Sequence, residues 1–309
     1  MAQNDSEIRI VDVVLTSNAR GYRNSMFAGF ALFPEVEAPS RGFKRIEFDR
    51  AAFRKHTTRR APGAAFKRIT SGHRGEPVKL QQHALIAETP VEHQEEGMKQ
   101  PGLNIQARKV TVVQDVIALS LECAQADAAR NAAMYAATNK IAYLGGSRWS
   151  DDASDPLQDV TDACEQIRKL TGRIANTFVV SAAVVAKLRL HPKILERFKH
   201  TNASSITDEM LASYFSVKNF VVAGGVFDDD LGTHDIWGKD AVLAFVPDGQ
   251  VQDAEVPAYG YTYRLASYPM VGAVRFNEDF DTWDNKVKDE WSPEAVGPDA
   301  GFLFQNCID

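Results

Sequence analysis

The stretch from residue 41 to residue 80 constrains this chain more than any other part of its sequence. It holds twelve lysines and arginines against three acidic residues, although the whole chain carries a net charge of -6. A concentrated charge of this kind needs an oppositely charged partner or stays in solvent. The stretch is also poor in large apolar side chains, and an isolated two-stranded ribbon is only marginally stable. We therefore predict that residues 41–85 form a long two-stranded arm that lies on another surface.

The last quarter of the chain has the opposite charge. Residues 228–309 contain seventeen acidic residues against five basic ones. A basic arm and an acidic region in one chain indicate self-complementarity, either within one molecule or between copies.

Composition excludes several classes of protein. Hydrophobic residues make up 44% and charged residues 25% of the chain, as in ordinary globular proteins. There is no apolar run of about 18 residues, so no transmembrane helix is expected, and the N-terminus lacks the pattern of a secretory signal. The three cysteines are too few and too scattered for a disulfide framework or a zinc site, which favours a reducing cytoplasm.

The pattern of apolar residues predicts mixed α+β structure. Residues 1–40 have little periodicity and are predicted to be an extended, loosely ordered arm. Residues 115–143 are rich in alanine with apolar residues three and four apart, which predicts one very long helix ended by Gly145 and Gly146. A second helix is predicted over residues 156–171, with Asp155 as its N-cap and Gly172 as its stop.

Short strands and helices are predicted to follow in alternation. The strands are expected at residues 176–180, 218–223, 240–246, 259–267 and 271–276. Short helices are expected at 181–190, 192–199 and 207–215, the last with Thr207 as N-cap. Strands and helices that are partly segregated in this way are typical of an α+β protein.

No motif in the sequence indicates catalysis, a cofactor or a metal. Gly224 and Gly225 follow a predicted strand, but the acidic residues after them do not suit a phosphate site. The acidic clusters lack the spacing of a calcium loop, and there is no nucleophile elbow. The basic arm carries few aromatic residues and no nucleic-acid-binding signature, so DNA binding through the arm is kept only as an alternative.

A series of short motifs follows along residues 40–305. In the arm they are Phe48-Asp49-Arg50, Phe53-Arg54 and Arg60-Ala61-Pro62-Gly63; in the middle they are Asn176-Thr177-Phe178-Val179-Val180, Leu188-Arg189-Leu190-His191-Pro192 and residues 194–199; later they are Trp237-Gly238-Lys239-Asp240, Leu243-Ala244-Phe245-Val246-Pro247 and Tyr259-Gly260-Tyr261-Thr262-Tyr263-Arg264. Each is weak alone, but their order and spacing resemble those of the major capsid proteins of tailed bacteriophages, the family with the Hong Kong 97-type (Johnson) fold.

The resemblance implies a set of parts for the chain. They are an N-terminal arm (1–40), an extended hairpin called the E-loop (41–85), a peripheral domain (86–155) with a spine helix (115–143), an axial domain (156–257), and a return to the peripheral domain with the C-terminal tail (258–309). It also implies a structural protein rather than an enzyme, whose copies assemble as hexamers and pentamers into an icosahedral head around double-stranded DNA.

The contacts between copies are expected to use the charged regions. The basic residues expected to contact a neighbouring subunit are Arg45, Arg50, Arg54, Arg59, Arg60, Lys67 and Arg68. Their candidate acidic partners are Asp228, Asp229, Asp230, Asp279, Asp281 and Asp284. A covalent crosslink through Lys67 or Lys79 is not expected, because neither aligns with a crosslinking motif.

The resemblance leaves further expectations and alternatives. The chain lacks the extra N-terminal region that serves some relatives as a built-in scaffold, so a separate scaffolding protein is expected, with a portal and possibly a decoration protein. Assembly is expected in the host bacterial cytoplasm and the finished protein in the virion. An encapsulin shell shares the fold and would hold cargo enzymes instead of a genome, whereas a DNA-binding protein would show strongly salt-dependent DNA affinity.

Overall fold

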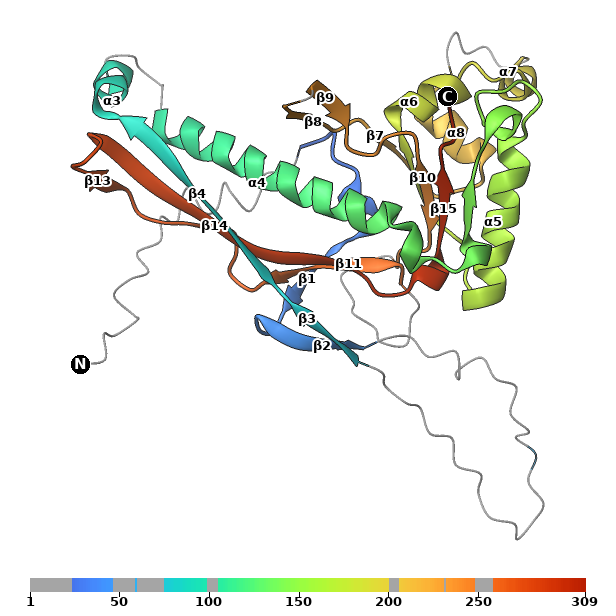
Figure 1. Cartoon of the computed structure of the whole chain (residues 1–309), viewed down its shortest axis with the longest axis horizontal. Coiled ribbons are helices and arrows are strands. Elements are labelled where there is room, and N and C mark those ends of the chain that lie inside the picture. The colour runs from blue at the N-terminus through green and yellow to red at the C-terminus, as the bar shows by residue number, and fades with distance from the viewer. Residues whose placement is uncertain are drawn as a thin grey trace.

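The computed structural model describes residues 24–46, 59, 75–98, 105–199, 206–230, 232–247 and 258–309 of the chain. Two sheets organise these residues (Figure 1). A six-stranded sheet with two helices forms what we call the long-sheet region, and a five-stranded sheet with four helices forms the compact region. The mixed architecture confirms the predicted α+β class. No helix of the described residues is both long and apolar enough to cross a membrane.

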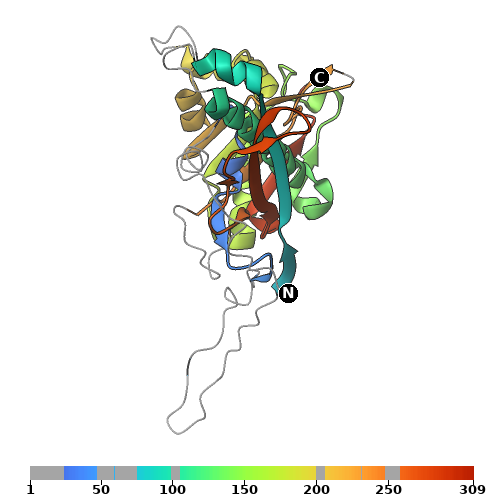
Figure 2. The ribbon, with the colours of Figure 1, turned by 90° about the vertical axis from the view of Figure 1, so that its left-hand side faces the viewer.

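The long-sheet region is built around β14 (Thr282–Ala295), a strand of 14 residues. The sheet runs in the order β1-β11-β14-β12, and β4 and β13 also pair with β14. The other strands are β1 (Glu35–Ala38), β4 (Gln81–Pro90), β11 (Gly260–Leu265), β12 (Met270–Val271) and β13 (Arg275–Asn277). Strands β4 and β14 pair antiparallel over their length, from Gln81 opposite Trp291 to Pro90 opposite Thr282. Figure 2 shows these two strands side by side from the end that carries α3 (Val91–Met98).

The long helix α4 (Ile105–Arg130) lies along one face of the β4–β14 pair (Figure 1). The predicted helix at 115–143 was therefore right in kind but wrong at both ends. The chain leaves the helix at Asn131, whose side chain accepts a hydrogen bond from the Ala133 amide in a short 3-10 turn. Buried Asn139 then donates to the carbonyl of Gly301 at 3.1 Å, so tertiary contacts override the helix propensity of the alanines.

The compact region holds the second sheet, in the order β5-β15-β10-β6-β7. These strands are β5 (Lys140–Ala142), β6 (Thr177–Ser181), β7 (Asn219–Ala223), β10 (Ala241–Ala244) and β15 (Gly301–Gln305). Its helices are α5 (Pro156–Thr171), α6 (Ala182–Leu188), α7 (Pro192–Phe198) and α8 (Asp208–Tyr214). Short 3-10 turns occupy Ala132–Met134, Ala137–Asn139, Gly145–Ser147 and Pro298–Ala300. A two-stranded hairpin of β8 (Val226–Asp229) and β9 (Gly232–Asp235) projects from this region.

Local signals fixed the helices of the compact region as predicted. Asp155 accepts a hydrogen bond from the Gln158 amide at 3.2 Å, and Gly172 ends α5 in the left-handed conformation. The Thr207 hydroxyl caps α8 by accepting from the Met210 amide at 3.3 Å. The strand predicted at 271–276 was wrong in detail, because β12 and β13 are two separate short strands on β14.

Residues 24–40 differ from the predicted loose arm. They form the short helix α2 (Gly29–Leu32), which packs on α4, and the edge strand β1, which pairs in parallel with β11. Leu32 and Phe33 are fully buried, so this segment belongs to the body of the protein. Residues 1–23 of the predicted arm lie outside the described residues.

Candidate functional site

The base of the predicted arm is a ribbon of two antiparallel strands. Strand β2 (Gly42–Ile46) pairs with β3 (Gly75–Lys79), from Gly42 opposite Lys79 to Ile46 opposite Gly75. The Leu80 amide also donates to the Arg41 carbonyl at 2.9 Å and closes the ribbon. Residues 46 and 75 therefore lie next to each other, and the 28 residues from 47 to 74 leave and re-enter the body at one place.

A first charged anchor fixes this ribbon to the long sheet. The Arg41 guanidinium donates to both oxygens of Glu290 on β14, at 2.7 and 2.9 Å. The Gln82 amide donates to the same carboxylate at 3.3 Å. Glu290 is buried, whereas Arg41 is 60% exposed. The hydrogen bond and charge of Glu290 raise the pKa of the Arg41 guanidinium, which stays protonated in any case.

A second anchor uses Arg45, which is only 8% exposed. Its guanidinium donates to Glu76 on β3 at 2.8 Å and to Glu294 on β14 at 3.2 Å. It also donates to the Ala295 carbonyl at 3.1 Å. These partners all belong to the same chain, and the contact of Arg45 with a neighbouring subunit stays a prediction. Because Arg45 is buried, its charge needs a paired carboxylate, and Glu76 and Glu294 supply one at the base of the arm.

Apolar contacts complete the seat of the ribbon. The Phe43 ring meets Tyr263 of β11 edge-on, with ring centroids 4.9 Å apart. Val78 and Leu80 are buried in the same cluster, which Ala38, Ala258 and Tyr261 complete. The base of the arm is thus a folded part of its own subunit, held by both charge and apolar contact.

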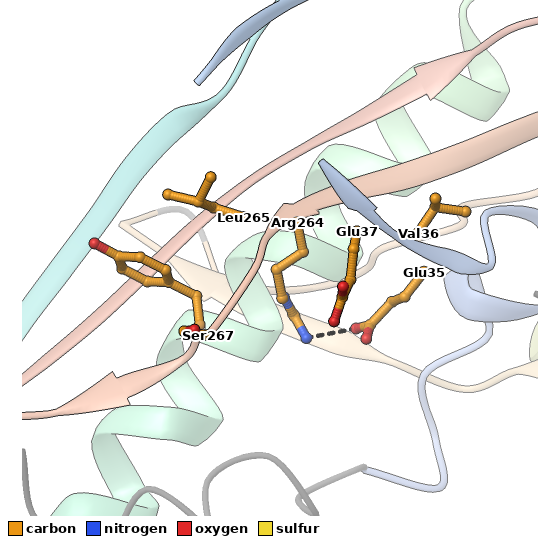
Figure 3. A pocket seen from close by; sticks show the side chains of 7 residues that line it. Glu35, Val36, Glu37, Arg264, Leu265 and Ser267 are labelled. Carbon is orange, nitrogen blue, oxygen red and sulfur yellow. Dashed lines mark ion pairs between the residues drawn. The ribbon is translucent and has the colours of Figure 1, made fainter. Parts of the chain in front are cut away.

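A half-open pocket of about 380 Å³ lies beside the arm base, where β1 and β11 end (Figure 3). Arg264 points into it and pairs with Glu35 at 2.6 Å and with Asp289 at 3.3 Å. Glu37 also points toward this cluster in Figure 3. Burial raises the pKa of the Asp289 carboxyl to about 6, although Arg264 opposes that shift. Carboxylates thus outnumber the single guanidinium here.

Most of the predicted basic contact residues lie outside the described residues. These are Arg50, Arg54, Arg60, Lys67 and Arg68. Arg59 is described and its side chain is exposed. Their contact with a neighbouring subunit therefore remains a prediction.

The predicted acidic partners occupy two separate places (Figure 1). Asp228, Asp229 and Asp230 are exposed at the β8–β9 hairpin, where Asp229 lies 3.3 Å from His234. Asp279 and Asp281 are exposed in the turn between β13 and β14, at the far end of the long sheet. Asp284 is half-buried there and accepts hydrogen bonds from Asn277 and Thr282. The two groups are therefore two distinct acidic surfaces.

The carboxylates that hold the arm base were not foreseen in the sequence. Glu290 and Glu294 lie on β14, which was not predicted as a strand. One signal was present, because Trp283, Asn285, Val287 and Trp291 alternate with more polar neighbours, as in a half-buried strand. The charges at Lys286, Lys288 and Asp289 obscured that pattern.

The contacts at the arm base hold the ribbon in place. No group of three or more His, Cys, Asp or Glu side chains suited to a metal ion is found within the described ranges. The charged side chains at the arm base pair with each other or with the backbone, and Cys307 is buried beneath the compact sheet. Burial raises the pKa of the Cys164 thiol to about 11, which makes it a poor nucleophile.

Comparison with known proteins gives a family and a fold. The family described as "Phage major capsid protein E" matches residues 50–259. A curated major capsid protein of Burkholderia phage BcepMu is 33% identical over an alignment of 309 positions, which covers 97% of this chain and 97% of that one. The crystal structure of a phage-related protein from Bordetella bronchiseptica has a TM-score of 0.84 and 35% identity, and the match covers 97% of this chain and 98% of that one.

More distant structures share only the fold. The capsid structure of cyanophage P-SCSP1u has a TM-score of 0.56 at 10% identity, over 92% of this chain and 89% of that one. The Hong Kong 97-like fold expected from the sequence is therefore confirmed.

Proposed function

The chain belongs to the phage major capsid protein E family, and from that membership we propose that its copies join into a closed shell through the basic arm. As a major capsid protein it is a structural component of the virion and not an enzyme. The proposal adds which part of the subunit makes the contact. Each arm, anchored on its own sheet, reaches over an adjoining copy.

One observation supports this proposal most strongly. The base of the arm is fixed to its own subunit, whereas the sequence beyond the base carries a further excess of basic residues. At the β2–β3 ribbon, Arg41 and Arg45 form ion pairs with carboxylates of the same subunit. Between residues 47 and 74 the sequence holds eight further basic residues against two acidic ones. A loop of 28 residues can extend up to about 45 Å from its base. It is long enough to reach an adjoining subunit that packs beside its base.

Charge and buried apolar area contribute differently to the contacts between subunits. Ring contacts in such assemblies are head-to-tail and close by symmetry. Permanent interfaces typically bury about 2,000–5,000 Å². Exposed ion pairs contribute only about 0–1 kcal/mol each, so arm charges mainly set register and suppress wrong pairings. Buried apolar surface supplies most of the affinity.

Two acidic surfaces are proposed to receive the arm. They are the β8–β9 hairpin and the β13–β14 turn described above, whose exposed aspartates have few basic neighbours along the chain. Because they lie far apart on the subunit, neutralising one and then the other identifies the acceptor.

The parts named from the family are proposed to map onto the two regions. The long-sheet region with α4 corresponds to the peripheral domain, and α4 is its spine helix. The compact region corresponds to the axial domain, which would line five-fold and six-fold axes. Residues 41–85 correspond to the E-loop, of which only the base is described.

The remaining partners are also proposals. Hexamers and pentamers would form an icosahedral head around double-stranded DNA, bound without sequence specificity, in the host bacterial cytoplasm. A separate scaffolding protein, a portal and a decoration protein would join them. The encapsulin alternative and the DNA-binding alternative lose support, because the full-length relative is a phage capsid protein.

Charge reversal tests the arm directly. In the triple variant Arg54→Glu, Arg59→Glu, Arg60→Glu we expect a folded chain that no longer forms shells, since the reversed charges repel the acidic acceptor. Negative-stain microscopy counts the particles, and circular dichroism checks the fold.

The matched control reverses three exposed bases outside the arm, Arg168, Lys169 and Arg173, at the end of α5. It changes the net charge equally and should leave the particle count within about twofold. Normal shells from the arm variant would refute the proposal.

A further inference from the structure

A buried carboxylate in the middle of α4 has no role in the arm contacts. Glu122 is 1% exposed, the lowest exposure of any acidic residue that the structure describes. No ion pair of Glu122 occurs among the described residues. A buried ion without a cation is a costly feature, and it persists only when its lone pairs are well satisfied.

Three donors from two distant segments satisfy this carboxylate. The Ala28 amide donates to Oε1 at 2.9 Å, and the Gly29 amide donates to Oε2 at 2.9 Å. The Trp237 indole donates to Oε1 at 2.7 Å. Burial raises the pKa of the Glu122 carboxyl, while these three hydrogen bonds lower it. Charge-assisted hydrogen bonds of this length are stronger than neutral ones.

The two segments approach α4 very closely at this point. A Cβ atom at Gly29 would lie 2.1 Å from Oε1 of Gln125. Gly238 follows Trp237 with a φ of +54°, and a Cβ there would lie 2.8 Å from the Arg130 guanidinium. The Arg130 side chain in turn donates to Asp240 at 2.7 Å and to the Ile236 carbonyl at 3.0 Å. The turn 236–240 is thus held twice by the second half of α4.

The contacts join the two regions of the subunit. Helix α4 packs on β4 and β14 of the long sheet. Trp237 lies in the turn that leads into β10 of the compact sheet, and it is 1% exposed. Glu122 is therefore a point at which the long-sheet region, the compact region and residues 24–33 meet.

We propose that Glu122 is a positioning residue for shell closure: its carboxylate holds residues 28–29 and the Trp237 turn against α4, and so fixes the angle between the long-sheet region and the compact region. Head-to-tail contacts generate a closed ring only if the rotation between copies closes, and otherwise produce open assemblies. A subunit whose two regions can tilt against each other would allow several rotations between copies, and only some of these would close the shell. This inference does not depend on which surface the arm contacts.

Two variants of the full-length chain test the inference. Glu122→Gln keeps the shape but places an amide NH₂ where an oxygen accepts a bond. Trp237→Phe removes one donor and keeps an aromatic ring, so it is the milder change. We expect hydrogen–deuterium exchange over residues 24–33 to rise about tenfold or more in Glu122→Gln, as expected for loss of a charged hydrogen bond. Exchange in β14 should stay unchanged.

Assembly provides the second readout. We expect Glu122→Gln to give open sheets, spirals or shells of mixed size, and Trp237→Phe to give a smaller shift in the same direction. The control for charge is Asp127→Asn, an exposed site on the same helix. The control for the indole is Trp291→Phe, because the Trp291 indole N–H is buried with no hydrogen-bond partner in the described chain.

The outcomes separate cleanly. Faster exchange at 24–33 together with faulty closure, in a chain that still folds, supports the role. Unchanged exchange in both variants overturns it, and so does faster exchange with shells of wild-type size and yield. If Glu122→Gln does not fold, Trp237→Phe decides by the same criteria. Failure of the arm proposal would instead appear in the arm variant, whose exchange at 24–33 should match wild type.

Discussion

The compact region and the long-sheet region are held together in different ways. In the compact region, Phe178 packs among the rings of Trp149, Phe215 and Phe304 in one large apolar core. The long-sheet region has two small apolar clusters of its own, one around Val287 and one around Tyr263, and it shares a third, larger cluster, which includes Phe33, Ala126 and Trp237, with the compact region. Guanidinium–carboxylate pairs at the arm base and around Arg264 add to them. Apolar burial gives stability without direction, whereas charged pairs give direction with little net stability.

This difference predicts a large gap between core truncations in the two regions. Phe178→Ala should lower the free energy of unfolding by about 3–5 kcal/mol, as for other buried Phe truncations. Val287→Ala should cost about 2 kcal/mol, because it removes two methyl groups from a small cluster. Urea unfolding of the unassembled chain measures both. Equal costs, or a larger cost for Val287→Ala, would remove the contrast between the regions.

The same difference explains which elements the sequence predicts. The α5 helix was predicted because Asp155, Pro156 and Gly172 are local signals that act within one turn. Strands such as β6 and β10 are short runs of apolar residues that tertiary contacts only complete. The elements of the compact region can therefore be predicted from the local sequence.

The elements of the long-sheet region are harder to predict from the sequence, because they depend on partners far away along the chain. Strand β14 carries Lys286, Lys288 and Asp289, and it pairs with β4 about 200 residues earlier in the chain. Helix α4 ends at Arg130 only because residues 131–139 find contacts elsewhere, although their alanines favour helix. Strand propensity depends on such cross-strand context more than helix propensity does.

The candidate site was predicted in part for the same reason. The basic stretch is visible as a local excess of charge, so the arm was found. Its anchors, Glu290 and Glu294, could not be chosen among seventeen acidic residues without the register of β14. The burial of Arg45 and its pairing with Glu76 and Glu294 were not predicted, because charge alone does not reveal burial.

Asp289 in the long-sheet region should make the free energy of unfolding depend on pH. Burial raises its pKa to about 6 from the ordinary value of 3.8. A carboxyl with a raised pKa binds its proton more tightly when folded, so its contribution is present below about pH 4 and lost as pH rises through about 6. A shift of this size corresponds to about 3 kcal/mol. We expect the unfolding free energy of the wild type to show this fall, measured by urea unfolding from pH 4 to 8.

Asp289→Asn should flatten that pH dependence between pH 4 and 7. The matched control, Asp279→Asn, changes an exposed residue in the β13–β14 turn and should leave the curve of the wild type in place. A Asp289→Asn curve that parallels the wild type would show that another group is responsible.

The Arg41–Glu290 pair tests the charged anchor of the arm base. Arg41→Ala should cost about 1.5–3 kcal/mol, because it leaves the buried Glu290 carboxylate without its guanidinium partner. The double variant Arg41→Ala, Glu290→Gln should recover part of that loss, since the charge left unpaired is then gone. Urea unfolding of the two variants and of Glu290→Gln completes the cycle. No recovery in the double variant would mean that the pair does not hold the arm base.

We propose that an arm anchored on its own sheet contacts an adjoining copy. A cryo-electron microscopy map of assembled shells tests this contact, by tracing residues 47–74 outward from the ends of β2 and β3. We expect Arg54, Arg59 and Arg60 to lie within ion-pair distance of carboxylates on a neighbouring subunit. A trace that places all three against their own subunit, with no neighbour in reach, would contradict it.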